Sequence, residues 1–194
     1  MNDFITCGIK DSEFIRGDVP MTKEELRVLT ISKLRLKKDS VLIDVGAGTG
    51  SISIEAGRIL KDGMVYAVER NEDAVDLINK NMEKFSVKNI QLVQGTAPEC
   101  LSNIKGFTHA VVGGSGGDLL SILKYLADNI KKGGRIVVNA ISHETLYHAY
   151  NFFRENNFTN VENIIVNISK SHERGNTVLY EALNPVNIIS GEPS

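Results

Sequence analysis

Two patterns of apolar and polar positions alternate along most of this chain. Short apolar runs, such as 41–45, 65–69 and 90–94, are each followed by a longer stretch with an apolar residue every three or four positions. The first pattern is typical of buried strands and the second of amphipathic helices. Further strands are expected at 110–112 and 135–140, and helices at about 51–60, 72–85, 99–104, 118–130 and 144–156. The alternation predicts an α/β fold, a parallel sheet with helices on both faces.

The two ends of the chain depart from this rhythm. Residues 1–21 show no clear period and are expected to form an N-terminal arm, followed by a capping box at 22–25 that opens a helix. Near the other end, runs at 164–168 and 178–183 have no helix between them, so a terminal hairpin is expected there. Residues 185–194 are expected to be a trailing tail, and 1–194 a single domain.

Glycines stand at positions 46, 48 and 50, between the strand that ends Ile43-Asp44-Val45 and the next helical pattern. Alternate glycines let the backbone turn sharply and approach a ligand, and the helix that follows presents free N–H groups. A dinucleotide fingerprint needs Gly or Ala at position 51, where Ser51 stands. The spacing instead resembles motif I of the class I S-adenosylmethionine-dependent methyltransferases. An ordinary tight turn is the competing interpretation.

Glu69 ends the next predicted strand, 19 residues beyond Gly50. A carboxylate there can accept hydrogen bonds from two neighbouring ribose hydroxyls. The motif and this acid together imply a Rossmann-like class I methyltransferase fold, a seven-stranded, mostly parallel sheet with an antiparallel last strand. They also imply S-adenosylmethionine as the cofactor.

Two further turns follow predicted strands at the same edge of the sheet. Ala97 lies in a Gly/Pro turn after the third strand, where this superfamily contacts adenine, although a plain turn is the alternative. The run 113–117, Gly-Gly-Ser-Gly-Gly, follows the fourth strand and offers N–H groups for an anion or room for a large flat substrate. We call residues 46–50 the first glycine loop and 113–117 the second glycine loop. A packing turn is the alternative for the second loop as well.

Few other residues suggest chemistry. Lys170 and Arg174 are on the connection of the predicted hairpin, which we expect to be part of the main sheet with its tip near the carboxyl edge. There they would suit a substrate with several carboxylates; a solvated tip is the alternative. The four histidines lack the spacing of a metal site, and Ser115 lacks the surroundings of a hydrolase nucleophile. We therefore expect no metal.

Composition narrows the class of protein. With 194 residues, 42% of them hydrophobic, the chain can bury a full core. A net charge of −2 gives no sign of the excess positive charge that is typical of nucleic-acid-binding proteins. Two distant cysteines, no secretion signal and no long apolar run predict a cytoplasmic protein that binds neither nucleic acid nor membrane.

Three longer segments resemble one family within that superfamily. They are the arm from Gly8 to Arg27, the run 110–117 and the run 133–140. The resemblance as a whole extends over nearly the whole chain. The family is that of the decarboxylating precorrin methyltransferases of cobalamin biosynthesis, whose stand-alone members methylate C15 of cobalt-precorrin-6B. The resemblance implies a homotetramer that also removes carbon dioxide from the C12 acetate of a corrinoid tetrapyrrole.

The resemblance also implies which residues bind. The cofactor set is Thr22, Gly46, Ala47, Gly48, Thr49, Gly50, Glu69 and Ala97. Candidates for substrate binding are Gly113, Gly114, Ser115, Gly116, Gly117, Lys170 and Arg174. Glu69 stands where an Asp is common in the family, and no catalytic residue is assigned. Two alternatives stay open: an RNA methyltransferase of the same fold, for which no Trp and 6% aromatic residues are thin support, and a binding module without activity.

Overall fold

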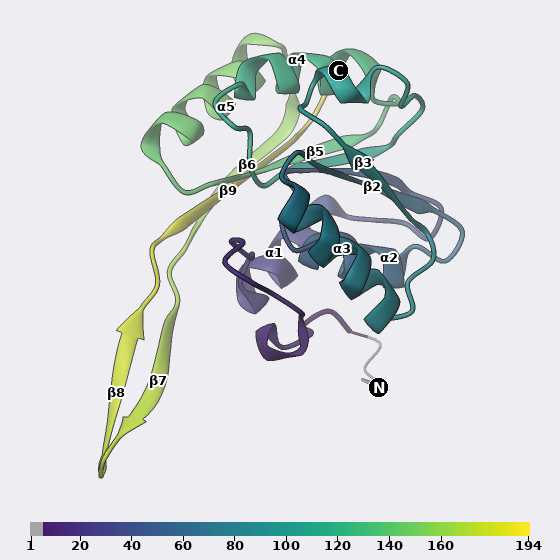
Figure 1. Cartoon of the computed structure of the whole chain (residues 1–194). Coiled ribbons are helices and arrows are strands. Elements are labelled where there is room, and N and C mark those ends of the chain that lie inside the picture. The colour runs from purple at the N-terminus through teal and green to yellow at the C-terminus, as the bar shows by residue number, and fades with distance from the viewer. Residues whose placement is uncertain (1–5) are drawn as a thin grey trace.

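The computed structural model describes residues 6–194, so the first five residues of the expected arm lie outside the described part. A seven-stranded sheet runs through the molecule in the order β3-β2-β1-β4-β5-β9-β6 (Figure 1). The strands of this sheet are β1 (Val41–Val45), β2 (Met64–Glu69), β3 (Ile90–Gln94), β4 (His109–Val112), β5 (Arg135–Ala140), β6 (Thr159–Val166) and β9 (Val186–Glu192). β9 is antiparallel to both of its neighbours, β5 and β6. The predicted fold class is confirmed.

Helices cover both faces of this sheet. They are α1 (Glu24–Leu34), α2 (Ser51–Ile59), α3 (Glu72–Lys84), α4 (Leu119–Asn129) and α5 (His143–Glu155). Figure 1 shows α1, α2 and α3 against one face and α4 and α5 against the other. Each face has its own apolar core, because successive strand residues point to opposite sides. Leu42 packs with Ile31 and Ile52 in one core, and Ile43 packs with Ile122 and Phe153 in the other.

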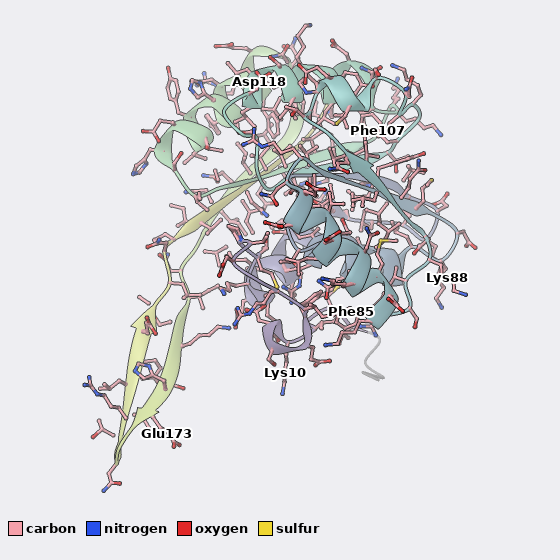
Figure 2. The ribbon with its side chains drawn as sticks, viewed as in Figure 1. Lys10, Phe85, Lys88, Phe107, Asp118 and Glu173 are labelled. Carbon is pink, nitrogen blue, oxygen red and sulfur yellow. The ribbon has the colours of Figure 1, made fainter. Side chains whose placement is uncertain are left out.

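The C-terminal part differs from the sequence prediction. The expected hairpin strand at 178–183 is not in the main sheet but in β8 (Thr177–Ala182), which pairs with β7 (Ser169–Arg174) in a separate two-stranded sheet that we call the ribbon. The ribbon projects away from the body, and Glu173 lies near its outer end (Figure 2). The expected tail is β9, whose Ile188 and Ile189 are at most 1% exposed. The tail prediction was wrong because β9 fills the gap between β5 and β6.

The start of α1 also departs from expectation. Its N-cap is Lys23, which makes no side-chain capping hydrogen bond, so the predicted capping box does not form. The Thr22 carbonyl instead accepts a hydrogen bond from Arg27 Nη1 at 2.6 Å. Glu25, the other end of the predicted box, pairs with Lys170 at 2.8 Å. Short 3-10 turns at η1 (Asp11–Glu13) and η2 (Glu99–Leu101) complete the described elements, the second where a short helix was expected.

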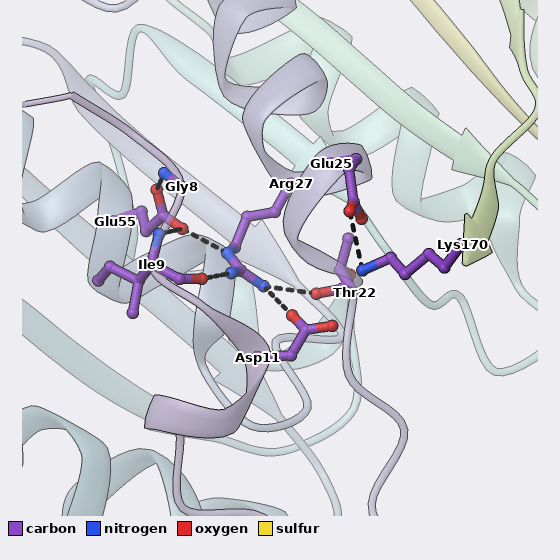
Figure 3. Close-up of polar contacts among 8 residues, drawn as sticks. All are labelled: Gly8, Ile9, Asp11, Thr22, Glu25, Arg27, Glu55 and Lys170. Carbon is purple, nitrogen blue, oxygen red and sulfur yellow. Dashed lines mark hydrogen bonds and ion pairs between the residues drawn. The ribbon is translucent and has the colours of Figure 1, made fainter. Parts of the chain in front are cut away.

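A buried ion pair fastens the N-terminal arm to the body (Figure 3). Arg27 of α1 is fully buried and its Nε donates to Glu55 Oε1 of α2 at 2.5 Å. Glu55 also accepts from the backbone N–H groups of Gly8 and Ile9, and Arg27 donates to the Ile9 carbonyl. Because Arg27 bonds Thr22 as well, one guanidinium holds both ends of the arm segment from 9 to 22.

Candidate functional site

A cavity of about 750 Å³ opens at the carboxyl ends of the parallel strands. The predicted site residues that line it are Thr22, Gly46, Ala47, Gly48, Glu69, Ala97, Gly113, Gly114, Ser115 and Gly116. Five predicted site residues do not line it: Thr49, Gly50, Gly117, Lys170 and Arg174. Both glycine loops and the turn after β3 therefore meet at one hollow.

The two glycine loops touch backbone to backbone. A Cβ atom on Gly46 would lie only 2.6 Å from the carbonyl oxygen of Gly114. A Cβ atom on Gly48, whose φ is +57°, would lie 2.9 Å from the carbonyl oxygen of Pro20 in the arm. Both positions combine a positive φ with no room for a side chain, so glycine is required there. The arm thus passes directly over the first glycine loop.

Asn81 of α3 ties the arm to that loop. Its Nδ2 donates to the carbonyl oxygens of Thr49 and Ile15, each at 2.9 Å. Its Oδ1 accepts from the N–H of Ile15 at 2.8 Å. One fully buried amide therefore fixes the distance between the arm and the back of the first glycine loop. Thr49 lies in that supporting layer and not in the cavity wall.

Glu69 is oriented by three backbone N–H groups. Its Oε2 accepts from Gly48 at 2.9 Å, and its Oε1 accepts from Arg70 at 2.8 Å and Asn71 at 3.0 Å. A carboxylate has about four acceptor positions, so one remains, on Oε2. The side chain is placed as expected for a ribose contact, but in this conformation it has one position for a hydroxyl and not two.

Two buried polar atoms beneath the first glycine loop lack partners. Asp44 Oδ2 accepts from Ser53 Oγ at 2.6 Å, whereas Asp44 Oδ1 and Thr49 Oγ1 make no hydrogen bond. Burial, with a smaller contribution from the nearby charge of Glu69, raises the pKa of Asp44 to about 6. A cation bound in the cavity would favour the ionised carboxylate. This unbalanced acid, the glycine backbone and the oriented Glu69 fit a ligand that carries both a ribose and a positive charge.

The ribbon does not contribute to this cavity. Lys170, at its inner end, pairs with Glu25 of α1 at 2.8 Å (Figure 3). This pairing raises the pKa of Lys170, and the pKa of Glu25 is lowered by Lys170 although burial opposes the shift. Arg174 lies at the far end of β7, where the ribbon turns. The expectation that the connection would lie close to the carboxyl edge assumed a hairpin inside the main sheet.

The sequence analysis missed part of the cavity wall. The missed residues include Asp18, Val19, Pro20, Met21, Lys23, Arg70, Asn139, Ile141 and Val186. The arm segment 18–21 carried no periodic signal, and Val186 fell in the supposed tail. Asn139 is the next to last residue of a predicted strand, close to the carboxyl edge, which was the available signal for it.

A second cavity, of about 330 Å³, lies at the opposite, amino end of the strands and contains none of the predicted site residues. His109 is buried in its wall. Burial and the nearby charges of Lys37 and Arg135 lower the pKa of His109 to about 4. Across residues 6–194, no three His, Cys, Asp or Glu side chains are grouped to hold a metal ion. Nor is any helix in that range long and apolar enough to cross a membrane.

Comparison with known families decides between the methyltransferase classes. A family model described as "Precorrin methyltransferase domain" matches residues 13–191. The chain belongs to the precorrin methyltransferase family. A relative from Sulfolobus acidocaldarius is 42% identical over 187 residues, which cover 95% of this chain and 97% of the relative. A relative from Saccharolobus solfataricus is 40% identical, over 98% of each chain. Both are named "Probable cobalt-precorrin-6B C(15)-methyltransferase (decarboxylating)".

Solved structures agree with this membership. A precorrin-6y C5,15-methyltransferase from Geobacter metallireducens has a TM-score of 0.91 and 37% identity, over 98% of each chain. A precorrin 8w decarboxylase from Methanobacterium thermoautotrophicum has a TM-score of 0.88 and 37% identity, over 94% of this chain and 98% of the other. A tRNA (m1A58) methyltransferase from Aquifex aeolicus covers 93% of this chain and 72% of the other, with a TM-score of 0.77 and 15% identity, and shares the fold alone.

Proposed function

We propose that this protein transfers a methyl group from S-adenosylmethionine to C15 of cobalt-precorrin-6B and removes carbon dioxide from the C12 acetate. The observation that carries the proposal is the family membership, since relatives with this name match over almost the entire chain. The cavity supports it independently, because the two glycine loops and Glu69 meet there.

The residues around the cofactor half of the cavity have separate tasks. When bound, S-adenosylmethionine supplies an electrophilic methyl group on a positively charged sulfur. Glu69, held by backbone N–H groups, orients the ribose. Gly46 and Gly48 let the backbone approach without side chains, and the buried Asp44 balances positive charge. Alignment of the two reactants at close range then supplies much of the acceleration.

The other half of the cavity, beside the second glycine loop, is the acceptor half. It positions the methyl acceptor and excludes water. The second glycine loop itself contributes one side chain, that of Ser115, to the cavity wall, so a flat macrocycle can approach its backbone closely. Methyl transfer breaks the bond between sulfur and methyl, leaves the electron pair on sulfur and puts one positive charge on the ring. The electron pair left when carbon dioxide departs from the ionised acetate neutralises that charge, and a proton lost from the macrocycle is matched by one gained at the former acetate carbon, which becomes a methyl group. No side chain of the cavity is assigned as that proton donor.

The experiment is incubation of the purified protein with cobalt-precorrin-6B and methyl-labelled S-adenosylmethionine, followed by mass spectrometry. The expected product gains one labelled methyl group and loses one carbon dioxide. A product that gains the methyl group and keeps its carboxylate would contradict the decarboxylating half. No label transfer to the corrinoid, together with transfer to RNA, would favour the RNA methyltransferase.

We further propose that the protein assembles as a homotetramer in the cytoplasm. The ribbon supports assembly, because Val178 and Tyr180 are 58% and 74% exposed on a projecting sheet, and apolar surface of this kind commonly marks an interface. Cys7 and Cys100, both free thiols, agree with a reducing compartment. Light scattering should give four times the monomer mass for the wild type and a smaller mass for Tyr180→Glu. A monomeric wild type would contradict this assembly.

A further inference from the structure

Asn139 presents part of its side-chain amide to the cavity. It lies near the carboxyl end of β5 and lines the cavity wall. Its Oδ1 accepts a hydrogen bond from Thr30 Oγ1 of α1 at 3.0 Å. Its Nδ2 has no hydrogen-bond partner among residues 6–194, so two N–H donors are available to a ligand.

Thr30 is fully buried and cannot itself contact a ligand. Its hydroxyl also lies 2.7 Å from the carbonyl oxygen of Leu26, one turn earlier in α1. The single hydroxyl hydrogen is shared between these two acceptors, so Thr30 connects the Asn139 amide to its own helix. An amide held in this way loses little rotamer freedom when a ligand binds, which favours affinity.

Asn139 lies in the half of the cavity that the cofactor does not need. The sheet order places β5 two strands from β1 and three from β2, which carries Glu69. At about 4.8 Å per strand, Asn139 is roughly 14 Å across the sheet from the ribose position. Groups on β5 therefore face the acceptor.

Lys23 stands at the start of α1, two helical turns before Thr30 and so on the same face of that helix. It precedes Leu26 by one turn at the start of α1, and both residues line the wall. Lys23 makes no ion pair with any residue between 6 and 194, whereas the cations of the ribbon are either paired or remote. An ammonium and two amide N–H groups in one cavity half suit a carboxylate.

We propose that Asn139, positioned by Thr30, and Lys23 together bind a side-chain carboxylate of the tetrapyrrole and so orient the ring for reaction. The inference rests on the proposed function and assigns substrate recognition to α1 and β5 rather than to Lys170 and Arg174. Thr30 is a positioning residue in this scheme.

The test measures KM and kcat for cobalt-precorrin-6B, and Kd for S-adenosylmethionine by calorimetry. Asn139→Leu and Lys23→Gln should each raise KM roughly tenfold and leave the cofactor Kd unchanged. Asn139→Asp should raise KM further, because a carboxylate would face a carboxylate, and added salt should reduce that effect. Lys38→Gln, which removes an exposed lysine remote from the cavity, is the charge control.

Two substitutions at Thr30 distinguish a positioning role of its hydroxyl from a role in packing alone. Thr30→Val keeps the shape and removes the hydroxyl, so KM should rise several-fold, whereas Thr30→Ser should behave as wild type. An active wild type whose KM is unchanged in Asn139→Leu, or in Asn139→Asp, overturns this inference and leaves the proposed function standing. A change in the cofactor Kd alone also overturns it. A wild type without turnover overturns both proposals.

Discussion

The backbone N–H of Gly48 donates to Glu69 Oε2 at 2.9 Å, which joins the first glycine loop directly to the acidic end of β2. Because Arg70 and Asn71 occupy Oε1, two ribose hydroxyls can bind only if one backbone donor is released. We expect Gly48 to be released, since its loop faces the ligand. In amide NMR spectra, S-adenosylmethionine should shift the Gly48 resonance more than those of Arg70 and Asn71. An unmoved Gly48 resonance in the saturated complex would mean that Glu69 binds one hydroxyl.

Removing the charge of Glu69 should weaken the binding of S-adenosylmethionine. Glu69→Gln keeps the shape but loses a charged acceptor, so binding should weaken by about 1–3 kcal/mol. Glu72→Gln, which removes an exposed acid three residues further on in α3, is the matched control. Calorimetric titration of both variants measures the difference. Equal affinities would place the ribose elsewhere.

A side chain at Gly48 should affect binding more than its backbone strain alone predicts. Gly48→Ala puts a Cβ atom 2.9 Å from the Pro20 carbonyl and displaces the arm that borders the cavity. Gly133 also has a positive φ, +77°, but nothing lies within 4 Å of its Cβ position. Both alanine variants should lose about 1–2 kcal/mol of stability from the left-handed backbone, and Gly48→Ala should lose more. Only Gly48→Ala should lose cofactor affinity, as measured by calorimetry beside urea unfolding.

Asp44 should make the protein less stable as pH rises. Its folded pKa of about 6 exceeds the ordinary 3.8, so between these values the native state holds a proton that the unfolded chain releases. The free energy of unfolding therefore falls through this window, by about 3 kcal/mol from this group. Asp44→Asn should be more stable than wild type at pH 7.5 and equal to it below pH 4, by urea unfolding. The same substitution should weaken the binding of S-adenosylmethionine, because the negative charge of Asp44 no longer balances the positive charge of the cofactor.

His109 should make the protein more stable as pH rises, over nearly the same pH range in which Asp44 makes it less stable. Its folded pKa of about 4 lies below the ordinary 6.5, so the unfolded chain binds the extra proton and stability falls as pH drops through this window. In the wild type, the two residues therefore have partly cancelling effects on how the free energy of unfolding changes with pH. The His109→Gln variant should therefore lose stability as the pH rises from 4 to 6. The Asp44→Asn variant should gain stability over the same rise in pH. Parallel unfolding curves of the two variants at several pH values check this, and slopes of the same sign would contradict it.

Local signals were sufficient for the half of the cavity to which we assign the cofactor. The glycines at 46 and 48 have the positive φ that their spacing predicts, and Glu69 ends its strand beside them. Strand, turn and acid all lie within about 30 residues of one another, so each is determined by short-range backbone geometry and by the parallel pairing of β1 with β2. The family resemblance drew on further segments, at 8–27, 110–117 and 133–140, and was confirmed.

The ribbon and β9 needed the tertiary structure. β8 carries the apolar run 178–180, which is typical of a core strand, and nothing local indicates that Val178 and Tyr180 stay exposed in the ribbon. β9 carries Gly191 and lies in the segment expected to be a tail, yet it is buried because it pairs with β5, about 50 residues earlier in the chain.

The sequence by itself determined the α/β fold, the first glycine loop and the acid at Glu69, because backbone φ preferences and hydrophobic periodicity act over a few residues. Only the tertiary structure decided that β9 completes the sheet, that the arm passes over Gly48, and that Thr30 holds Asn139. These contacts join residues far apart in the chain, and they form because buried strand edges and amide groups must find hydrogen-bond partners wherever the fold supplies them.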